Sequence, residues 1–175
     1  APEHDGQAIY LLGTTRDELD GSEWARFKGH LGGLPPKVDL AVERQLGDML
    51  VNMSRDGMID AAHDVAAGGL AAALAEACLR FNTGARIGLG EVAERDGLDL
   101  FSESLGRVVV SVPRSEEVRF KDMCTARQFP FARIGVVDAL SNALDFQNEV
   151  SINLDELRAA HEGTMAAHFG EVAQG

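Results

Sequence analysis

The sequence has few cysteines, a deficit of positive charge and no long apolar run, and each shortage excludes a class of protein. Its two cysteines, Cys78 and Cys124, share no metal-like spacing with the histidines, so we expect buried, reduced thiols rather than a disulfide or metal ligands. With 16 basic against 28 acidic residues the net charge is −12, which disfavours binding to nucleic acid or to an anionic membrane. No apolar run approaches the ~20 residues that span a bilayer. These features predict a soluble, cytoplasmic protein.

The length and composition fit one domain. A chain of 175 residues with 45% apolar content can bury a single sizeable core, and we expect order from about residue 6 to about residue 169. The first six residues have no initiator methionine, basic region or apolar stretch, so we do not expect them to form a signal peptide. We expect them to follow a cut inside a longer polypeptide.

The hydrophobic pattern alternates between strands and helices without strict βαβ regularity. We expect Ser115 and Asn153 to cap the helices that follow them. The predicted strands are Ala8–Leu12, Met58–Ala62, Ala85–Leu89, Arg107–Val112, Ala132–Val137 and Leu144–Phe146, and the predicted helices are Val38–Arg55, Leu70–Phe81, Ser115–Gln128 and Asp155–His168.

The segment Met58–Glu76 is the most informative stretch of the chain. It joins a short apolar strand to an apolar helix through a loop that ends in Gly68 and Gly69, and His63 and Asp64 precede this loop. Adjacent glycines tolerate positive φ and let a bound group approach the backbone, while the helix directs unpaired N–H groups at the same place. The pattern predicts a phosphate site, and the structural alternative is a tight turn without a ligand.

A second polar cluster comprises Ser102, Glu103, Ser104 and Arg107. A carboxylate between hydroxyls can hold a metal-bound water or a ribose hydroxyl, and an arginine at the head of a strand can pair with phosphate. The structural alternative is an ion pair between Glu103 and Arg107 on a solvated rim, which would contribute little stability. No group of histidines, cysteines and carboxylates has recognisable zinc spacing, so we assign no metal ligands.

These motifs, together with the early segment AIYLLGTTRDELDGSEW, resemble the C-terminal domain of phosphoribosylformylglycinamidine synthase. The resemblance runs from about Gly6 to about Phe169 and implies an α+β fold, a three-layer α/β/α sandwich with a mixed sheet. The chain departs from the family pattern at Ala66 and Ala67, where a Ser-Asp pair is common, and at Asp20, where glycine is usual. Hydroxyl and carboxylate contacts are therefore absent at Ala66 and Ala67, whereas backbone contacts survive. Aspartate at position 20 is compatible with a turn.

The resemblance implies a role in an ATP-dependent ligase of purine biosynthesis, with ATP and Mg²⁺ bound in the intact enzyme. That enzyme converts formylglycinamide ribonucleotide and glutamine-derived ammonia to the amidine. The family's catalytic histidine and most of its nucleotide site lie upstream, so no catalytic residue is assigned here and we expect no tightly bound cofactor.

The expected partners are the upstream synthetase domains, a glutaminase subunit or domain and a small accessory subunit, and we expect the separated domain to self-associate. Two alternatives remain open. The chain could come from another ATP-dependent member of the superfamily, such as aminoimidazole ribonucleotide synthetase, or it could be a non-catalytic docking module.

Overall fold

The computed structural model describes residues 4–13, 40–65, 69–88, 106–147 and 150–163. Its strands form one seven-stranded sheet in the order β2-β4-β1-β5-β3-β6-β7. All neighbouring strands are antiparallel except β3 and β6, which are parallel. The strands are β1 (Ala8–Leu12), β2 (Ala61–Asp64), β3 (Gly84–Ile87), β4 (Val108–Val112), β5 (Phe131–Asp138), β6 (Ala143–Phe146) and β7 (Val150–Asn153).

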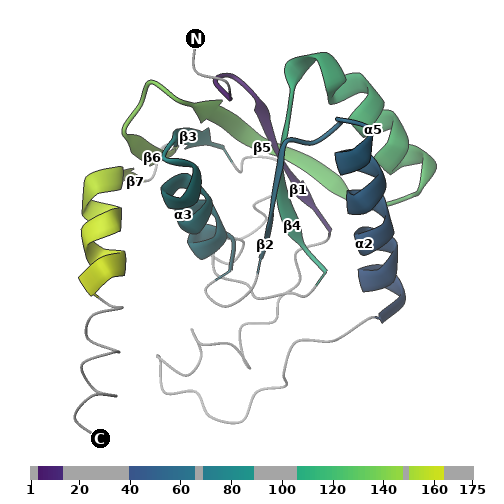
Figure 1. Cartoon of the computed structure of the whole chain (residues 1–175), viewed down its shortest axis with the longest axis horizontal. Helices are drawn as coiled ribbons and strands as arrows, with labels where there is room; N and C mark the ends of the chain where they lie inside the picture. The colour runs from purple at the N-terminus through teal and green to yellow at the C-terminus, as the bar shows by residue number, and fades with distance from the viewer. Residues whose placement is uncertain (1–3, 14–39, 66–68, 89–105, 148–149, 164–175) are drawn as a thin grey trace, which may run out of the picture.

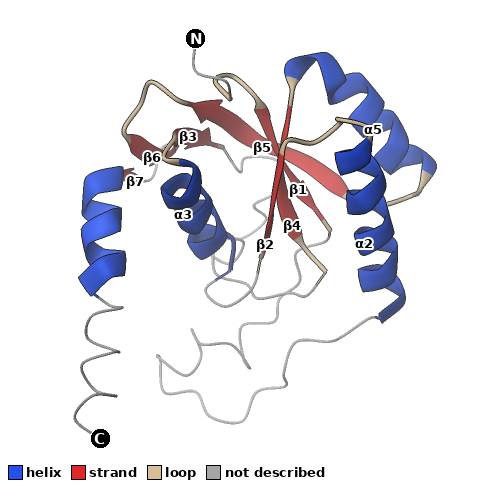
Figure 2. Cartoon of the chain, in the orientation of Figure 1, coloured by secondary structure: helices blue, strands red, loops and turns tan. Residues whose placement is uncertain are grey.

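Helices cover both faces of this sheet, so the fold has three layers (Figures 1 and 2). Helices α2 (Leu40–Arg55) and α5 (Glu117–Ala126) lie on one side, and α3 (Gly69–Phe81) lies on the other together with a C-terminal helix described over residues 154–163. A short 3₁₀ turn, η1 (Arg114–Glu116), leads into α5. The expected α+β sandwich with a mixed sheet is confirmed.

Two apolar clusters hold the layers together, because alternate residues of the central strands point to opposite faces. Ile9 and Leu11 of β1 face α3, whereas Ala8, Tyr10 and Leu12 face α2 and α5. All five β1 residues are buried, as a central strand covered on both faces requires. The cysteines are free and buried, one in each cluster, and burial raises the pKa of each thiol to about 11.

Most predicted elements are confirmed, and one strand is displaced. The strand expected over Met58–Ala62 begins only at Ala61, because Met58 and Ile59 pack into the α2-side cluster as part of the connection from α2. The Met58 N–H donates to the carbonyl of Met53 and closes the end of that helix. His63 and Asp64 consequently lie inside the strand rather than in the loop after it.

Of the two predicted helix caps, one is wrong and one is confirmed. Ser115 lies inside η1, and no side chain caps either η1 or α5. Asn153 does cap the C-terminal helix, because its side-chain oxygen accepts a hydrogen bond from the Asp155 N–H at 2.7 Å. The segment around Asn153 also forms β7, a strand that the sequence pattern did not predict.

A polar network fixes α5 against the sheet. The Tyr10 hydroxyl donates to Glu117 at 2.8 Å, and the Arg133 guanidinium donates to the same carboxylate oxygen at 3.1 Å. Burial and the neighbouring Glu117 raise the pKa of Tyr10. Burial alone would raise the pKa of Glu117, but hydrogen bonds from Tyr10 and Arg133 and the positive charge of Arg133 outweigh it, so the pKa is lowered.

We expect Glu117→Gln to lower the free energy of unfolding by about 1–2 kcal/mol at neutral pH, since it weakens two hydrogen bonds to a charged acceptor. A carboxylate with a lowered pKa stabilises the fold above its unfolded pKa, about 4.3, and this contribution disappears as the pH falls through the folded value. Urea unfolding at pH 7 and pH 3 should therefore show a gap between wild type and variant that closes in acid. Glu116→Gln, which disrupts an i,i+3 surface pair with Arg119, should change stability by less than about 0.5 kcal/mol at either pH.

Candidate functional site at one end of the sheet

The end of β2 and the start of α3 form the first part of the candidate site. Helix α3 begins at Gly69, whose φ of 69° lies in the left-handed region that a glycine adopts without steric cost. The expected positive-φ glycine at this helix start is confirmed. The helix has thirteen residues including Gly69, and its first turn has no acidic side chain, so the start of α3 is electrostatically favourable for an anion.

Within β2 the two predicted polar residues point to opposite faces of the sheet. His63 lies opposite Val109, which belongs to the α3-side core, and Asp64 lies opposite Val108, which belongs to the α2-side core. The structure therefore does not bring His63 and Asp64 together. His63 instead contacts α3, where its Nε2 lies 2.9 Å from a carboxylate oxygen of Glu76.

Arg107 lies immediately before β4, as expected, but only 1% of its surface is exposed. It engages at least one partner, and its carbonyl accepts the Val65 N–H at 3.1 Å, which extends the β2–β4 ladder. Arg107 therefore does not lie on a solvated rim, and Glu103, its partner in the structural alternative, lies outside the described residues. Arg107 is a buried part of the fold, next to the end of β2.

A close backbone approach shapes the same end of the sheet. Gly13 follows β1 with φ of 100°, and Gly106 precedes Arg107 with φ of 74°. A Cβ atom on Gly13 would lie 2.3 Å from the Gly106 carbonyl oxygen and 3.0 Å from Cγ of Arg107. The two connections therefore meet only because position 13 carries no side chain.

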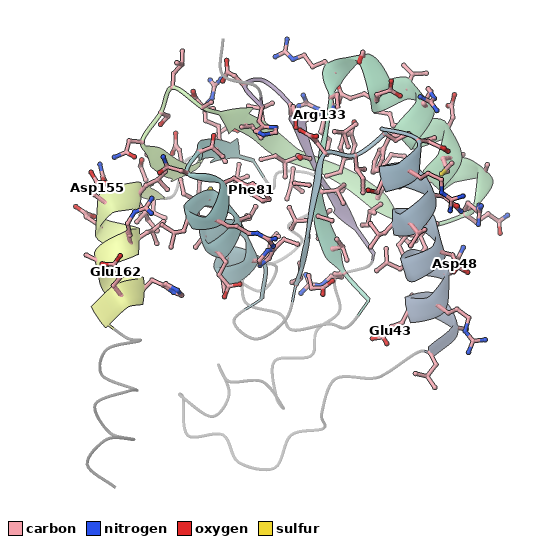
Figure 3. All side chains as sticks on the ribbon, viewed as in Figure 1. Glu43, Asp48, Phe81, Arg133, Asp155 and Glu162 are labelled. Atoms are coloured by element: carbon pink, nitrogen blue, oxygen red, sulfur yellow. The ribbon has the colours of Figure 1, made fainter. Side chains whose placement is uncertain are left out.

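A pocket of about 360 Å³ lies between the first half of α2 and the adjoining ends of β2 and β4. Its polar residues are Glu43, Asp64 and Arg107, and its apolar wall includes Leu46 and Leu50. Figure 3 shows Glu43 near the start of α2, on the side of the molecule that this pocket occupies. The sequence analysis did not single out Glu43; the available signal was an acidic residue in the first turn of an amphipathic helix.

The remaining predicted residues cannot be placed. Gly68, Ser102, Glu103 and Ser104 lie outside the described residues, as do Ala66, Ala67 and the segment of residues 14–39. Of the eight predicted site residues, the structure thus places His63, Asp64, Gly69 and Arg107. Asp64 and Arg107 share the pocket under α2, Gly69 opens α3, and His63 faces the α3 layer.

This arrangement offers two kinds of chemistry at one end of the domain. The start of α3 favours negative charge, whereas the carboxylates of Glu43 and Asp64 favour a cation or hydrogen-bond donors in the pocket under α2. Among the described residues, His63 is the imidazole held by a carboxylate near this end of the sheet, through its contact with Glu76.

Comparison with known proteins identifies the family. The model of the family described as AIR synthase related protein, C-terminal domain, matches residues 4–143. Among curated proteins, the chain is 66% identical over 170 residues to the phosphoribosylformylglycinamidine synthase subunit PurL of Renibacterium salmoninarum, and 58% identical over 166 residues to that of Nocardia farcinica. These matches cover 95% and 94% of this chain, but only 22% of either relative.

Solved structures agree on the fold. T. maritima PurL complexed with FGAR superposes with a TM-score of 0.71 at 22% identity, covering 87% of this chain and 28% of that one. Thiamine-monophosphate kinase from Stenotrophomonas maltophilia K279a superposes with a TM-score of 0.56 at 19% identity, covering 83% and 52%. No helix among the described residues could span a membrane. The chain therefore belongs to the family of AIR synthase related C-terminal domains.

Proposed function

We propose that this chain is the C-terminal part of the synthetase subunit PurL of phosphoribosylformylglycinamidine synthase. The observation that carries the proposal is 66% identity to a PurL subunit over 95% of the chain, far above the 19% shared with the thiamine-monophosphate kinase of the same fold. In the reaction, ATP activates the amide oxygen of formylglycinamide ribonucleotide as a phosphate, and ammonia derived from glutamine displaces that phosphate. The chain supplies one wall of the cleft in which this occurs.

Gly68 and Gly69 present backbone N–H groups to a phosphate of the ribonucleotide or nucleotide, with support from the dipole of α3. Arg107 keeps the neighbouring end of β4 in place, and its charge favours the same anion. Asp64 orients the substrate from the α2 side, and His63 holds the middle of α3 against β2 through its contact with Glu76. Ser102, Glu103 and Ser104 complete the wall as ligands for ribose hydroxyls.

The intact enzyme uses ATP, in keeping with T. maritima PurL complexes with ATP, ADP and AMPPCP. Mg²⁺ accompanies that nucleotide, but the described residues include no group of three or more His, Cys, Asp or Glu that could hold a metal. Glu43 and Asp64 line the pocket under α2, and such a pair of carboxylates would suffice beside phosphate oxygens and water, which supply the other ligands of nucleotide-bound Mg²⁺. The proposed partners are the remaining synthetase domains, a glutaminase and a small accessory subunit, as the PurLQS assembly of T. maritima suggests. The proposed location is the cytoplasm.

A chimera tests this function directly. In it, the matching segment of Renibacterium salmoninarum PurL is replaced with this chain, and the glutaminase and accessory subunits are added. We expect ATP-dependent amidine formation within about tenfold of the parent rate, because the two segments are 66% identical. The chain alone should give no turnover, since orientation and electrostatic stabilisation require both sides of the cleft.

Two controls make the result decisive. The parent enzyme truncated before this segment should be inactive, which shows that the segment is needed. A chimera that melts cooperatively, assembles and yet forms no product contradicts the proposal and favours a docking module or another ligase of the superfamily. Turnover by the isolated chain would contradict the division of the active site between domains.

The glycine loop can be tested by Gly69→Ala in the intact enzyme. The substitution places a methyl group where an approaching phosphate needs room and forces alanine into positive φ, at a cost of about 1 kcal/mol. We expect affinity for the ribonucleotide to fall at least tenfold, measured by calorimetry on folded protein.

The matched control is Gly57→Ala, because Gly57 has φ of 73° and lies in the turn after α2 with no atom within 4 Å of an added Cβ. It should cost similar stability and leave affinity unchanged. If Gly69→Ala lowers only the melting temperature, the loop is a structural turn and the phosphate assignment fails.

A further inference from the structure

Among the described strands, β2 is an edge of the sheet, and some backbone groups on its outer side point away from its neighbour β4. In the register with β4, the pair Val65–Arg107 is hydrogen-bonded. Since hydrogen-bonded and non-hydrogen-bonded pairs alternate in an antiparallel ladder, the N–H and C=O groups of Ala62 and Asp64 point away from β4. In the part of the chain that the structure describes, no strand pairs with this side.

The same short strand is flanked by a hollow on each face of the sheet. On the α3 face, a mainly apolar cavity of about 70 Å³ reaches Ala61 and Ala62 between Leu74, Cys78 and Phe81. On the α2 face, an open hollow of about 520 Å³ reaches the same two alanines and extends to Leu50, Val51 and Ile59. The space beside Ala61 and Ala62 stays open because their side chains end at Cβ.

These features together fit an added strand. Successive side chains of a strand alternate between the two faces of a sheet, so a strand paired with β2 would direct one side chain toward each hollow in turn. In recognition by strand addition, main-chain hydrogen bonds supply affinity and alternate pockets supply specificity. In Figure 1, β2 crosses in front of the sheet with α3 on one side and α2 on the other.

We propose that the β2 edge binds an extended segment of a partner protein, with adjacent apolar residues and basic residues beside them. The basic residues follow from charge complementarity. Asp60 and Asp64 bracket the edge and are both exposed. Asp60 also contacts His4 and Gln7, so Asp64 is the main carboxylate that a basic residue of the partner would meet, while Arg55 lines the α2-side hollow. The edge shares Asp64 with the pocket under α2, but strand pairing uses the backbone of Ala62 and Asp64, so the inference does not depend on the proposed function.

A second copy of the chain fits this edge poorly. Antiparallel pairing of two β2 strands about Ala62 would place Asp60 of each copy opposite Asp64 of the other. Like charges directly opposite each other destabilise a strand pair, and charged residues at edges commonly prevent such self-pairing. In the same register His63 would lie opposite Ala61 and alanine opposite Ala62, so neither hollow would receive a large apolar side chain. The edge therefore selects a different, basic strand.

The test uses the intact protein that contains this chain and a fluorescent peptide, acetyl-Lys-Val-Leu-Val-Lys-amide, as the probe. Fluorescence anisotropy measures its affinity, and hydrogen exchange reports protection of the Ala62 and Asp64 amides. We expect saturable binding with slowed exchange at both amides. The same peptide N-methylated on alternate residues, which removes its edge donors, should bind at least tenfold more weakly.

Two protein variants address the strand and the hollow separately. Ala62→Pro removes an outward donor at an edge position where proline is tolerated, and it should weaken binding about tenfold. Ala77→Leu fills the α3-side cavity that Ala77 lines and should weaken binding of the Val-Leu-Val probe. Ala72→Leu makes the same change on α3 away from that cavity and should leave affinity unchanged.

Equal binding of the normal and N-methylated peptides overturns strand addition, whatever the folding of the variants. Absence of saturable binding to the intact protein also overturns the proposal. In that case, binding to the 175-residue chain alone would mean that another part of the polypeptide occupies the edge. Equal affinity for a probe with glutamate in place of lysine would overturn the choice of a basic partner.

Discussion

Gly13→Ala is expected to lower the free energy of unfolding by roughly 3 kcal/mol or more. Two effects add at this position. Alanine at φ of 100° occupies a strained backbone region at a cost of about 1–3 kcal/mol, and its methyl group would lie 2.3 Å from the Gly106 carbonyl oxygen. The chain must shift there, and forced overpacking costs a further 1–3 kcal/mol or so.

Two other glycines separate these effects in urea unfolding experiments. Gly57→Ala shares positive φ but meets no atom within 4 Å, so it should cost only about 1 kcal/mol. Gly47→Ala lies within α2, has open space around its Cβ and should stabilise the protein by about 0.5–1 kcal/mol. If Gly13→Ala and Gly57→Ala were equally destabilising, the close approach to Gly106 would not contribute to the effect of Gly13→Ala on the free energy of unfolding.

Arg107→Ala is expected to destabilise the protein as much as Gly13→Ala does, lowering the free energy of unfolding by roughly 3–5 kcal/mol. The side chain is 1% exposed and has at least one partner, and removal of one member of a buried charged interaction leaves the other without compensation. The cavity left by the long side chain adds to this cost. Arg86→Ala is the comparison, because Arg86 pairs with Asp138 at 3.3 Å while its side chain is 64% exposed.

Chemical denaturation of both arginine variants checks the prediction, and Arg86→Ala should cost less than about 1 kcal/mol. Ligand affinity of Arg107→Ala has meaning only on the folded fraction. If the variant retained wild-type stability but lost ribonucleotide affinity, Arg107 would act as a ligand for phosphate and not as a support for the fold.

Sequence pattern predicted most of the fold because burial follows periodicity. Helix α3 and strands β1, β4 and β5 are strongly apolar or β-branched, and their predicted bounds agree with the structure within a residue or two. Strand β7, with three of its four residues exposed, carries no such signal, since it is held by pairing with β6. Met58 and Ile59, which precede β2, suggested a strand because they are apolar, although they are buried by packing in the cluster under α2.

The candidate site was less predictable, because its geometry depends on contacts between distant segments. The sequence motif suggested that the adjacent residues His63 and Asp64 act together, yet the alternation of side chains along β2 places them on opposite faces of the sheet. In the sequence, Gly13 is distinguished only by following a strand. The need for glycine there becomes evident only in the structure, where the connection before β4 lies against it. Glu43 reaches the site through the packing of α2.

The position of β1 has a consequence for synthesis of the protein. This strand occupies the centre of the sheet, between β4 and β5, and its Ala8 lies opposite Val112 and Val136. Both neighbours are therefore translated more than a hundred residues later, which at about 5–20 residues per second means a delay of several seconds or more. Throughout that interval five consecutive residues destined for full burial remain without sheet partners on the nascent chain, available to chaperones or to aggregation.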